Sequence, residues 1–477
     1  MQVLTRPLQK AVDATFQNVT PTRLWLQMAC ICICSLFFFC ASMVTITQHA
    51  HAIATVGSDA APSVIAAHQI KTAVETMDNT LADELLYKSG STEAQEMFEE
   101  SEKARINLSK QLITAARNIT YGRSEEVPIE NIQTALGQFL MEAQNARDLH
   151  NFGKDTDAST KYLAALRTLQ TRLLPGADAL DKANENVLED TFAHEKGASA
   201  MSRGLVLVIG IVLVALIGYT HLYVSMRFRR RLIPALLIAL TCTIIFLQHL
   251  ISMLAISSRN LVIAKEDAYN SVVALLDARS NSYDANAAES RALLDTAHAV
   301  DYENYFIEKV NSAAHFEKGH DFGETIARAR HQLENHEKFN LPGFSGSLAD
   351  ELSNVRFPGE AEAALESLEA FATYISTDRK IRQLETAGNH NEALKLGLGY
   401  DPRGSNFSFL KYDDALARTL KINQDQLNLA SKEAAQALEG LIPTSLLVTL
   451  LIIVCTYIGL SPRLDEYQTH HYAHRRS

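Results

Sequence analysis

One stretch of the 477-residue chain carries many polar and charged side chains on an otherwise apolar helical pattern. Within it, Asp277, Asp284 and Arg291 recur every seven residues and so share one helix face. An arginine fork binds a carboxylate, and aspartate or asparagine oxygens accept from an ammonium group, so this set suits an amino acid. The candidate ligand-binding residues are Arg279, Tyr283, Asp284, Asn286, Glu289 and Arg291. A solvated helix face with charges at i and i+7 is the simpler interpretation, and spacing alone favours it.

Signatures of enzyme chemistry are absent from the sequence. It contains no Gly-rich phosphate loop, no HExxH zinc motif, no nucleophile elbow and no kinase signature. The tail motif His470-His471-x-x-His474 could chelate a metal weakly, but such a motif is more often a solvated tail. All six cysteines lie in long apolar runs, where packing is their expected role. We therefore expect a protein that is not an enzyme, with no cofactor and no metal site.

Four apolar runs determine the organisation of the chain: residues 24–46, 204–225, 232–256 and 442–460. Each is long enough to cross the roughly 30 Å hydrocarbon layer of a membrane as a helix. The first run exceeds the roughly 7–15 apolar residues of a cleaved signal peptide, so we expect it to remain as an anchor. The sequence thus predicts four transmembrane helices.

Basic residues predict the orientation of these helices. The head (residues 1–23), the turn at 226–231 and the tail (461–477) each carry a net positive charge, whereas the whole chain has a formal net charge of −11. Short basic segments stay in the cytoplasm, so both termini and the turn are expected inside a plasma membrane that the chain crosses four times. The acidity of the remaining segments argues against nucleic-acid binding. The residues expected to set topology or bind a partner are Arg227, Arg229, Arg230 and Arg231.

Two long segments, residues 47–203 and 257–441, are therefore expected outside the cell as helical bundles. Apolar residues in the first recur at helical spacing from Ile70 to Leu85. Long helices with short breaks are typical of antiparallel bundles. The expected helices after this stripe lie near residues 92–119, 129–150 and 157–173, then from about 177 into the second span. In the second segment, a helix leaves the third span and runs to about residue 294. Further helices are expected near 302–316, 322–338, 359–388 and 408–440, and the last enters the fourth span. No strand is expected.

The two halves of the chain resemble one another in the order and spacing of their elements. The first span aligns with the third at an offset near 208, and residues 78–83 align with 284–289 at an offset of 206. A weaker set of polar residues, His68, Asp78, Asp83 and Glu84, occupies the first half. We expect an all-α membrane protein with four transmembrane helices and two extracytoplasmic helical-bundle domains, arranged as a tandem span–bundle–span duplication. Coincidence of composition is the alternative, because few residues are identical.

A resemblance to a known family rests on about 28 residues, from Ala268 to Asp295, and on the four-span layout. The run Tyr283-Asp284-Ala285-Asn286-Ala287-Ala288-Glu289-Ser290-Arg291 resembles a family of actinobacterial four-span membrane proteins that work with a glutamine-binding lipoprotein and protein kinase G. The resemblance implies that external acidic amino acids are reported by the lipoprotein, through the membrane protein, to the kinase. Residues 77–86 are also similar to the helical sensor bundles of chemoreceptors.

The sequence therefore favours a transmembrane signalling subunit that senses an extracytoplasmic solute, directly or through a solute-binding lipoprotein. It would relay the signal to a cytoplasmic partner such as a Ser/Thr protein kinase at residues 1–23, 226–231 and 461–477. The alternative is an envelope scaffold or an accessory subunit of a membrane complex that senses nothing. The sequence leaves open whether the chain forms a homo-oligomer.

Overall fold

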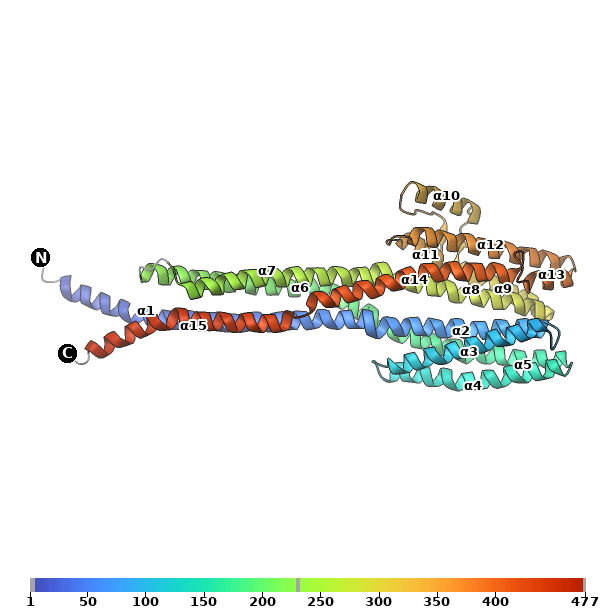
Figure 1. Ribbon diagram of the computed structural model, residues 1–477, viewed down its shortest axis with the longest axis horizontal. Coiled ribbons are helices and arrows are strands. Elements are labelled where there is room, and N and C mark those ends of the chain that lie inside the picture. Colours follow the sequence, from blue (N-terminus) through green and yellow to red (C-terminus); the bar gives the residue numbers. More distant parts are fainter. Residues whose placement is uncertain (1–4, 229–231, 475–477) are drawn as a thin grey trace. The chain divides into compact units, whose positions relative to one another are not determined.

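The computed structural model describes residues 5–228 and 232–474, with side chains from 21 to 228 and from 232 to 465. Nearly all of these residues are helical (Figure 1). Four helical stretches are long and apolar enough to cross a membrane: Pro21–Leu86, Asp155–Arg227, Pro234–Leu294 and Ser405–Asp465. The predicted fold class, an all-α membrane protein with four transmembrane helices, is confirmed.

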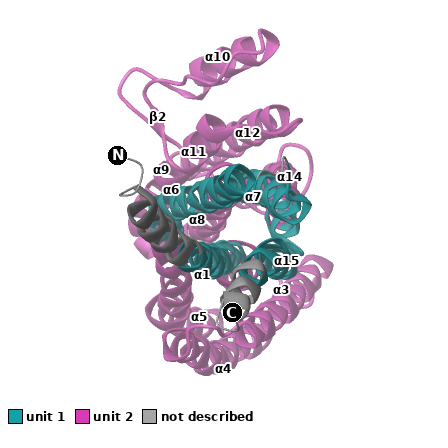
Figure 2. Ribbon diagram, turned by 90° about the vertical axis from the view of Figure 1, so that its left-hand side faces the viewer, with its two compact units in different colours: residues 1–53, 192–261, 432–477 teal, residues 54–191, 262–431 magenta. Residues whose placement is uncertain are grey.

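The chain forms two compact units, coloured separately in Figure 2. The span unit comprises residues 1–53, 192–261 and 432–477. The bundle unit comprises residues 54–191, here called the first half, and residues 262–431, the second half. The two segments that the sequence suggested as separate bundles thus pack together in one compact unit.

The span unit contains α1 (Thr5–Ala54), the later part of α6 (Leu174–Arg227), most of α7 (Pro234–Val262) and α15 (Leu441–His474). Large apolar side chains such as Phe37 and Ile245 are more than half exposed, as expected of helices that face lipid. One apolar cluster joins all four helices at one end of the unit. The beginning of α1, the end of α6, the start of α7 and the end of α15 lie at that same end (Figure 1).

The first half of the bundle unit contains four helical stretches before the chain returns to the spans. They are a π-helical segment η1 (Thr55–Asp59) with α2 (Ala60–Leu86), α3 (Thr92–Arg117), α4 (Arg123–Asn151), and α5 (Asp155–Thr168) with η2 (Leu169–Leu173) and the start of α6. The break expected between the helix at 157–173 and the one from about 177, at Pro175-Gly176, is wrong. The π-helical η2 widens the turn before Pro175, where the proline ring would clash with a preceding carbonyl, and the helix continues.

The second half follows the same order with additional elements. It contains η3 (Ile263–Tyr269) with α8 (Asn270–Leu294), η4 (Thr296–His298), α9 (Ala299–Ala313), α10 (Phe322–Glu334), α11 (Ser347–Asn354), α12 (Glu360–Thr386), α13 (His390–Gly397) and α14 (Ser405–Leu438). Strands β1 (His315–Phe316) and β2 (Phe344–Ser345) pair antiparallel, contrary to the expectation of no strand. Strands of two residues leave no periodic pattern in a sequence.

The expected passage of α14 into the fourth span is interrupted at Gly440, whose φ of 75° ends the helix.

Matching hydrogen bonds identify the two halves as repeats. In the first half, the Asn118 side-chain amide donates to the Asp59 carbonyl (2.6 Å) and to Ser63 Oγ (2.7 Å). In the second half, the Asn354 amide donates to the Asp267 carbonyl (2.9 Å) and to Ser271 Oγ (3.0 Å). Asp59 and Ser63 correspond to Asp267 and Ser271 at the predicted offset of 208. The tandem duplication is confirmed.

A second pair of equivalent hydrogen-bond arrangements lies at the N-termini of α4 and α12. Glu125 accepts the backbone N–H groups of Thr120 and Tyr121 at 2.8 and 2.6 Å. Glu360 accepts those of Arg356 and Phe357 at 2.6 and 2.8 Å. Each carboxylate thus satisfies two N–H groups just before its own helix and lies at the positive end of the helix dipole. The turn between α3 and α4 and that between α11 and α12 are therefore equivalent.

Candidate functional site

The predicted ligand-binding stretch lies in the interior of the bundle unit. Residues Asp284 to Leu293 of α8 are all buried, because α2, α9, α11 and α13 pack around this helix. The interpretation of the stretch as a solvated helix face is therefore wrong. A helix enclosed on all sides can carry polar residues only where other elements supply partners.

Several of these partners come from α2 in the other half of the bundle unit. We call the facing polar residues the α2–α8 seam: Glu75, Asp78, Asn79 and Asp83 from α2, with Ser280, Ser290 and Arg291 from α8. Arg291 Nε lies 3.0 Å from Asp78 Oδ2, and both side chains are fully buried. Burial alone would lower the pKa of Arg291, but Asp78 reverses that effect and raises it. The guanidinium group therefore stays charged and fixes the two halves to each other.

Ser290 and Asn406 surround a second carboxyl group of the seam. Ser290 Oγ donates to Asp83 Oδ1 (2.5 Å), and the Asn406 amide donates to Asp83 Oδ2 (3.2 Å). Ser290 also lies 3.1 Å from Asn79 Oδ1. Burial raises the pKa of Asp83 to about 6, even though both hydrogen bonds lower it. This carboxyl group therefore changes charge close to neutral pH.

Glu289 belongs to a buried pair of carboxyl groups. Ser405 Oγ donates to Glu289 Oε2 at 3.0 Å, and Asp378 lies beside it. Burial and the nearby Asp378 raise the pKa of Glu289 well above its usual range. Arg382, 3.0 Å from Asp378 Oδ1, compensates the charge of Asp378. Its surroundings thus favour the protonated form of Glu289.

The remaining candidates also have partners within the chain. Arg279 forms a bidentate pair with Asp413 (2.7 and 2.8 Å), and the Tyr283 hydroxyl donates to Asp413 Oδ2 at 3.1 Å. Asp284 accepts from the Tyr305 hydroxyl at 2.7 Å and lies 3.0 Å from the Lys309 ammonium. Asp78 and Asp413 thus occupy both arginine forks that the sequence suggested for a ligand carboxylate.

Two of the six candidates, Tyr283 and Asn286, reach an open pocket of about 330 Å³ in the bundle unit. This volume lies within the range of small-molecule sites, roughly 300–1,000 Å³. Helices of both halves line it, namely α2 and α3 from the first, and α8 and α14 from the second. Its lining residues are Thr76, Asn79, Thr80, Glu96, Met97, Glu99, Glu100, Lys103, Tyr283, Asn286, Tyr400, Asn406, Phe409 and Leu410.

Sequence reasoning missed most of this lining. Glu96, Glu99 and Glu100 occupy one exposed face of α3, a pattern that is usually a solvated surface. Asn406 follows a Gly-rich loop more than 300 residues away from Asn79. The spacing of the three glutamates could have indicated one polar face on α3. Only the packing of the two halves places that face beside α14.

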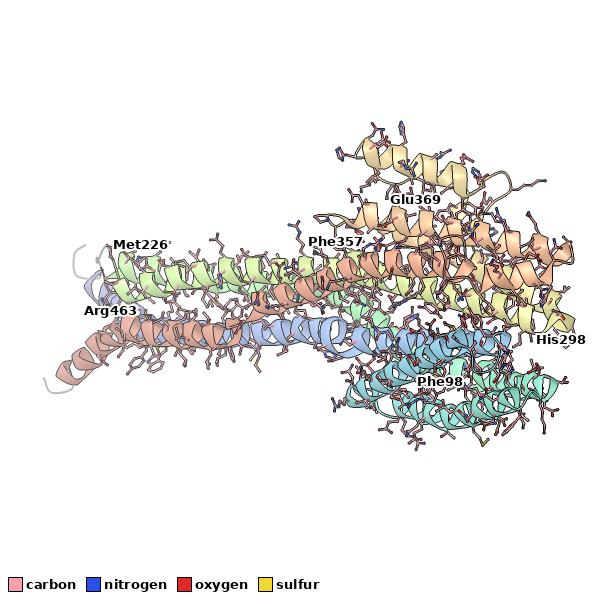
Figure 3. All side chains as sticks on the ribbon, turned by 45° about the vertical axis from the view of Figure 1, so that its right-hand side comes forward. Phe98, Met226, His298, Phe357, Glu369 and Arg463 are labelled. Carbon is pink, nitrogen blue, oxygen red and sulfur yellow. The ribbon has the colours of Figure 1, made fainter. Side chains whose placement is uncertain are left out.

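Other charged groups lie apart from this pocket. Arg147 Nε pairs with Glu84 at 2.7 Å, and the guanidinium lies 5.1 Å from the ring centre of Phe98, labelled in Figure 3. In the described part of the chain, no three His, Cys, Asp or Glu residues are grouped to hold a metal ion.

Of the four arginines predicted to set topology, Arg227 ends α6 and is exposed. Arg229, Arg230 and Arg231 lie outside the described residues. Met226, next to the last residue of α6, lies at the end of the span unit that also contains Arg463 of α15 (Figure 3).

Comparison with known proteins identifies one domain. Residues 52–193 match the family model of the actinobacterial sensor domain. No curated protein and no solved structure matches the chain. The matched segment corresponds closely to the first half of the bundle unit, residues 54–191. The match supports a sensor protein of actinobacteria with a sensing or signalling role, and four apolar helices fit a multi-pass membrane protein.

Proposed function

We propose that this chain is a non-enzymatic signalling subunit of the plasma membrane, in which the bundle unit senses a small extracytoplasmic solute. The pocket beside the α2–α8 seam carries the proposal, because both halves contribute to its lining. A solute in such a pocket contacts α3 and α14 at once and so favours one packing of the halves over another. The match to a sensor domain over residues 52–193 supports the same role.

The helices that line the pocket also supply the path of the signal. The helical stretches Pro21–Leu86 and Pro234–Leu294 each join a span to a seam helix. The junctions are the π-helical segments η1 and η3, at equivalent positions of the two repeats. Helices shift by small translations or rotations in many switching proteins, and a continuous helix passes such a shift along its axis. A shift of α2 against α8 would therefore become a shift of the first span against the third.

We place the output on the basic segments, residues 1–23, 226–231 and 461–477, on the cytoplasmic side. The partner there would be a separate protein such as a Ser/Thr protein kinase. The solute would bind directly or arrive on a solute-binding lipoprotein, and acidic amino acids are the class that the family resemblance suggests.

Replacement of the arginine turn tests the output. Substituting Arg227, Arg229, Arg230 and Arg231 by glutamine should abolish co-purification of the cytoplasmic partner with the full chain. Solute binding, measured by thermal shift, should not change, because the pocket lies in the other unit. Since these arginines also direct topology, a reporter fused after Ser477 must show that the tail remains inside. An exported tail in the unsubstituted protein would refute the proposed orientation.

A pull-down of the intact protein from membranes, with and without added solutes, distinguishes a signalling subunit from an envelope scaffold. A signalling subunit should bind or release its partner as the solute concentration changes. Constant co-purification with transport or division proteins, with no solute shifting the melting temperature, would instead identify a scaffold.

A further inference from the structure

The charges around the pocket determine which solutes it can accept. Its lining carries three carboxylates, Glu96, Glu99 and Glu100, against the single ammonium of Lys103. Lys103 Nζ lies 3.0 Å from Glu100 Oε2, so one carboxylate is already compensated. Glu96 and Glu99 form no salt bridge among the described residues, although Lys103 also attracts Glu99 and the Gln95 amide donates to Glu99 Oε1 at 3.1 Å. A site with this excess of negative charge attracts cations and repels anions, most strongly at low ionic strength.

The deeper part of the pocket supplies hydrogen bonds instead of charge. Asn79, Asn286 and Asn406 line it, and each is more than 90% buried. Each amide uses one end on the protein: Asn79 on Ser290, Asn286 on the Tyr374 hydroxyl, and Asn406 on Asp83. No hydrogen bond within the described residues involves the other end of any of the three amides. The free ends of the three amides line the open pocket, where a polar ligand can replace water as their hydrogen-bond partner.

Apolar surface completes the lining. Phe409 is almost fully buried, and its ring packs edge-to-face on Tyr283 with ring centres 4.8 Å apart. Met97 and Leu410 add aliphatic surface. A ligand there would contact apolar groups over its carbon skeleton, amides at one end and carboxylates at the other.

We propose that this pocket binds a small solute with a protonated amine and without net negative charge, such as a diamine or a basic amino acid. Its ammonium group would pair with Glu96 and Glu99, and its remaining polar groups would bond to the three asparagine amides. The inference rests on the proposed sensing role and specifies its ligand class. Free glutamate or aspartate, with a net negative charge, would bind poorly here, so an acidic amino acid would need another route to the chain, such as the lipoprotein.

Calorimetry on the full chain in lipid nanodiscs tests the ligand class. The probes are putrescine, L-lysine and L-glutamate at about 50 mM salt, where surface charges are weakly screened. We expect putrescine or lysine to bind at least tenfold more tightly than glutamate, and its affinity to fall as salt is added. Glutamate binding as tight as that of either cation would overturn the amine class while leaving the sensing role intact.

A pair of matched variants then locates the binding. The double substitution Glu96→Gln and Glu99→Gln should weaken binding of the cationic probe at least tenfold, because it removes the two lining carboxylates that form no salt bridge. Glu93→Gln removes one charge from the exposed face of the same helix outside the pocket and should change nothing. Unchanged affinity in the double variant would refute the site. Failure of all three probes to bind would refute it too, whereas the pull-down with the arginine-turn variant judges the signalling role independently.

Discussion

The two halves of the bundle unit preserve the same junctions around different cores. Each half begins with a π-helical segment, and an asparagine side chain donates a hydrogen bond to a backbone carbonyl of that segment. In each half, a later helix also begins with a glutamate that accepts two backbone N–H groups. Their interiors differ. The first half packs its helices across fully or almost fully buried alanines: Ala135, Ala143, Ala146, Ala158 and Ala165. The second half fills its interior with aromatic rings: Phe306, Phe371, Tyr374, Phe409 and Tyr412.

This difference indicates which parts of the repeat must keep the same structure in both halves. Small side chains let helix axes approach closely, whereas rings fill wider spaces between helices, so each interior suits its own helix spacing. The junctions next to the spans have kept the same hydrogen bonds. We infer that attachment of the seam helices to the spans is the shared requirement, while the packing behind them was free to change.

The largest expected effect comes from breaking the contact that joins the halves. Arg291→Met leaves Asp78 buried without its counter-charge, and we expect a loss of roughly 3–5 kcal/mol in the free energy of unfolding. Urea unfolding of the full chain, followed by circular dichroism, measures it. Arg279→Met is the matched control, because Arg279 pairs within the second half and is partly exposed. A smaller loss for Arg291→Met than for Arg279→Met would contradict the seam as the main polar link.

The second test concerns the alanine packing of the first half. Ala143→Leu forces a larger side chain between closely packed helices, and we expect it to cost about 1–3 kcal/mol. Ala116→Leu makes the same change on the exposed face of α3 and should be almost neutral. Equal effects of the two substitutions in thermal unfolding would show that the first half does not depend on close approach.

The third test asks whether the shared junctions are energetically equivalent. Asn118→Ala and Asn354→Ala each remove an amide that bridges a turn to a π-helical segment, and each should cost about 1–2 kcal/mol. Asn131→Ala, on an exposed face of α4, is the control. If one junction variant is neutral while the other is costly, only one repeat still depends on this attachment.

The last test uses a difference between the junctions themselves. Three residues before Asn354 the second half has Glu351, where the first half has Ala115. Burial, and then the neighbouring Glu360, raise the pKa of Glu351 to about 8. The folded state therefore holds this proton more tightly than the unfolded state, whose carboxyl has an ordinary pKa near 4.5. Its contribution to stability is complete below about pH 4.5 and is lost as the pH rises through 8.

Glu351→Gln should accordingly raise the melting temperature between pH 7 and 9 and flatten its dependence on pH in that range. We expect this gain to be smaller than the three losses above, because water can reach an ionised buried group and reduce its cost. A melting temperature of the unsubstituted protein that rises between pH 6 and 9 would contradict the assignment.

The sequence was most informative where structure depends on local pattern. Apolar runs longer than a membrane is thick, and apolar residues at helical spacing, predicted the spans and most helices of the bundle unit. Short-range rules failed at Pro175, where a π-helical turn accommodates the proline. They also failed at the two-residue strands, which carry no period.

The site was less predictable because its partners are distant in sequence. The polar character of α8 was correctly singled out, but spacing alone could not show that Arg291 faces Asp78, 213 positions earlier. The choice between a solvated face and an enclosed helix depended on the packing of the other half. The sequence around the pocket glutamates of α3 does not differ from that of an ordinary solvated helix face, so it could not predict that they line a pocket.

The buried Arg291–Asp78 pair has a consequence for the segment matched by the sensor-domain family. Residues 52–193 contain the acidic member of this pair but not the basic one. Cut out of the chain, that segment would present Glu75, Asp78 and Asp83 on an uncovered face, with no cation of its own opposite Asp78. It is thus half of a folding unit. If residues 52–193 of this chain were expressed without the second half, a second polypeptide would have to supply the missing positive charge opposite Asp78.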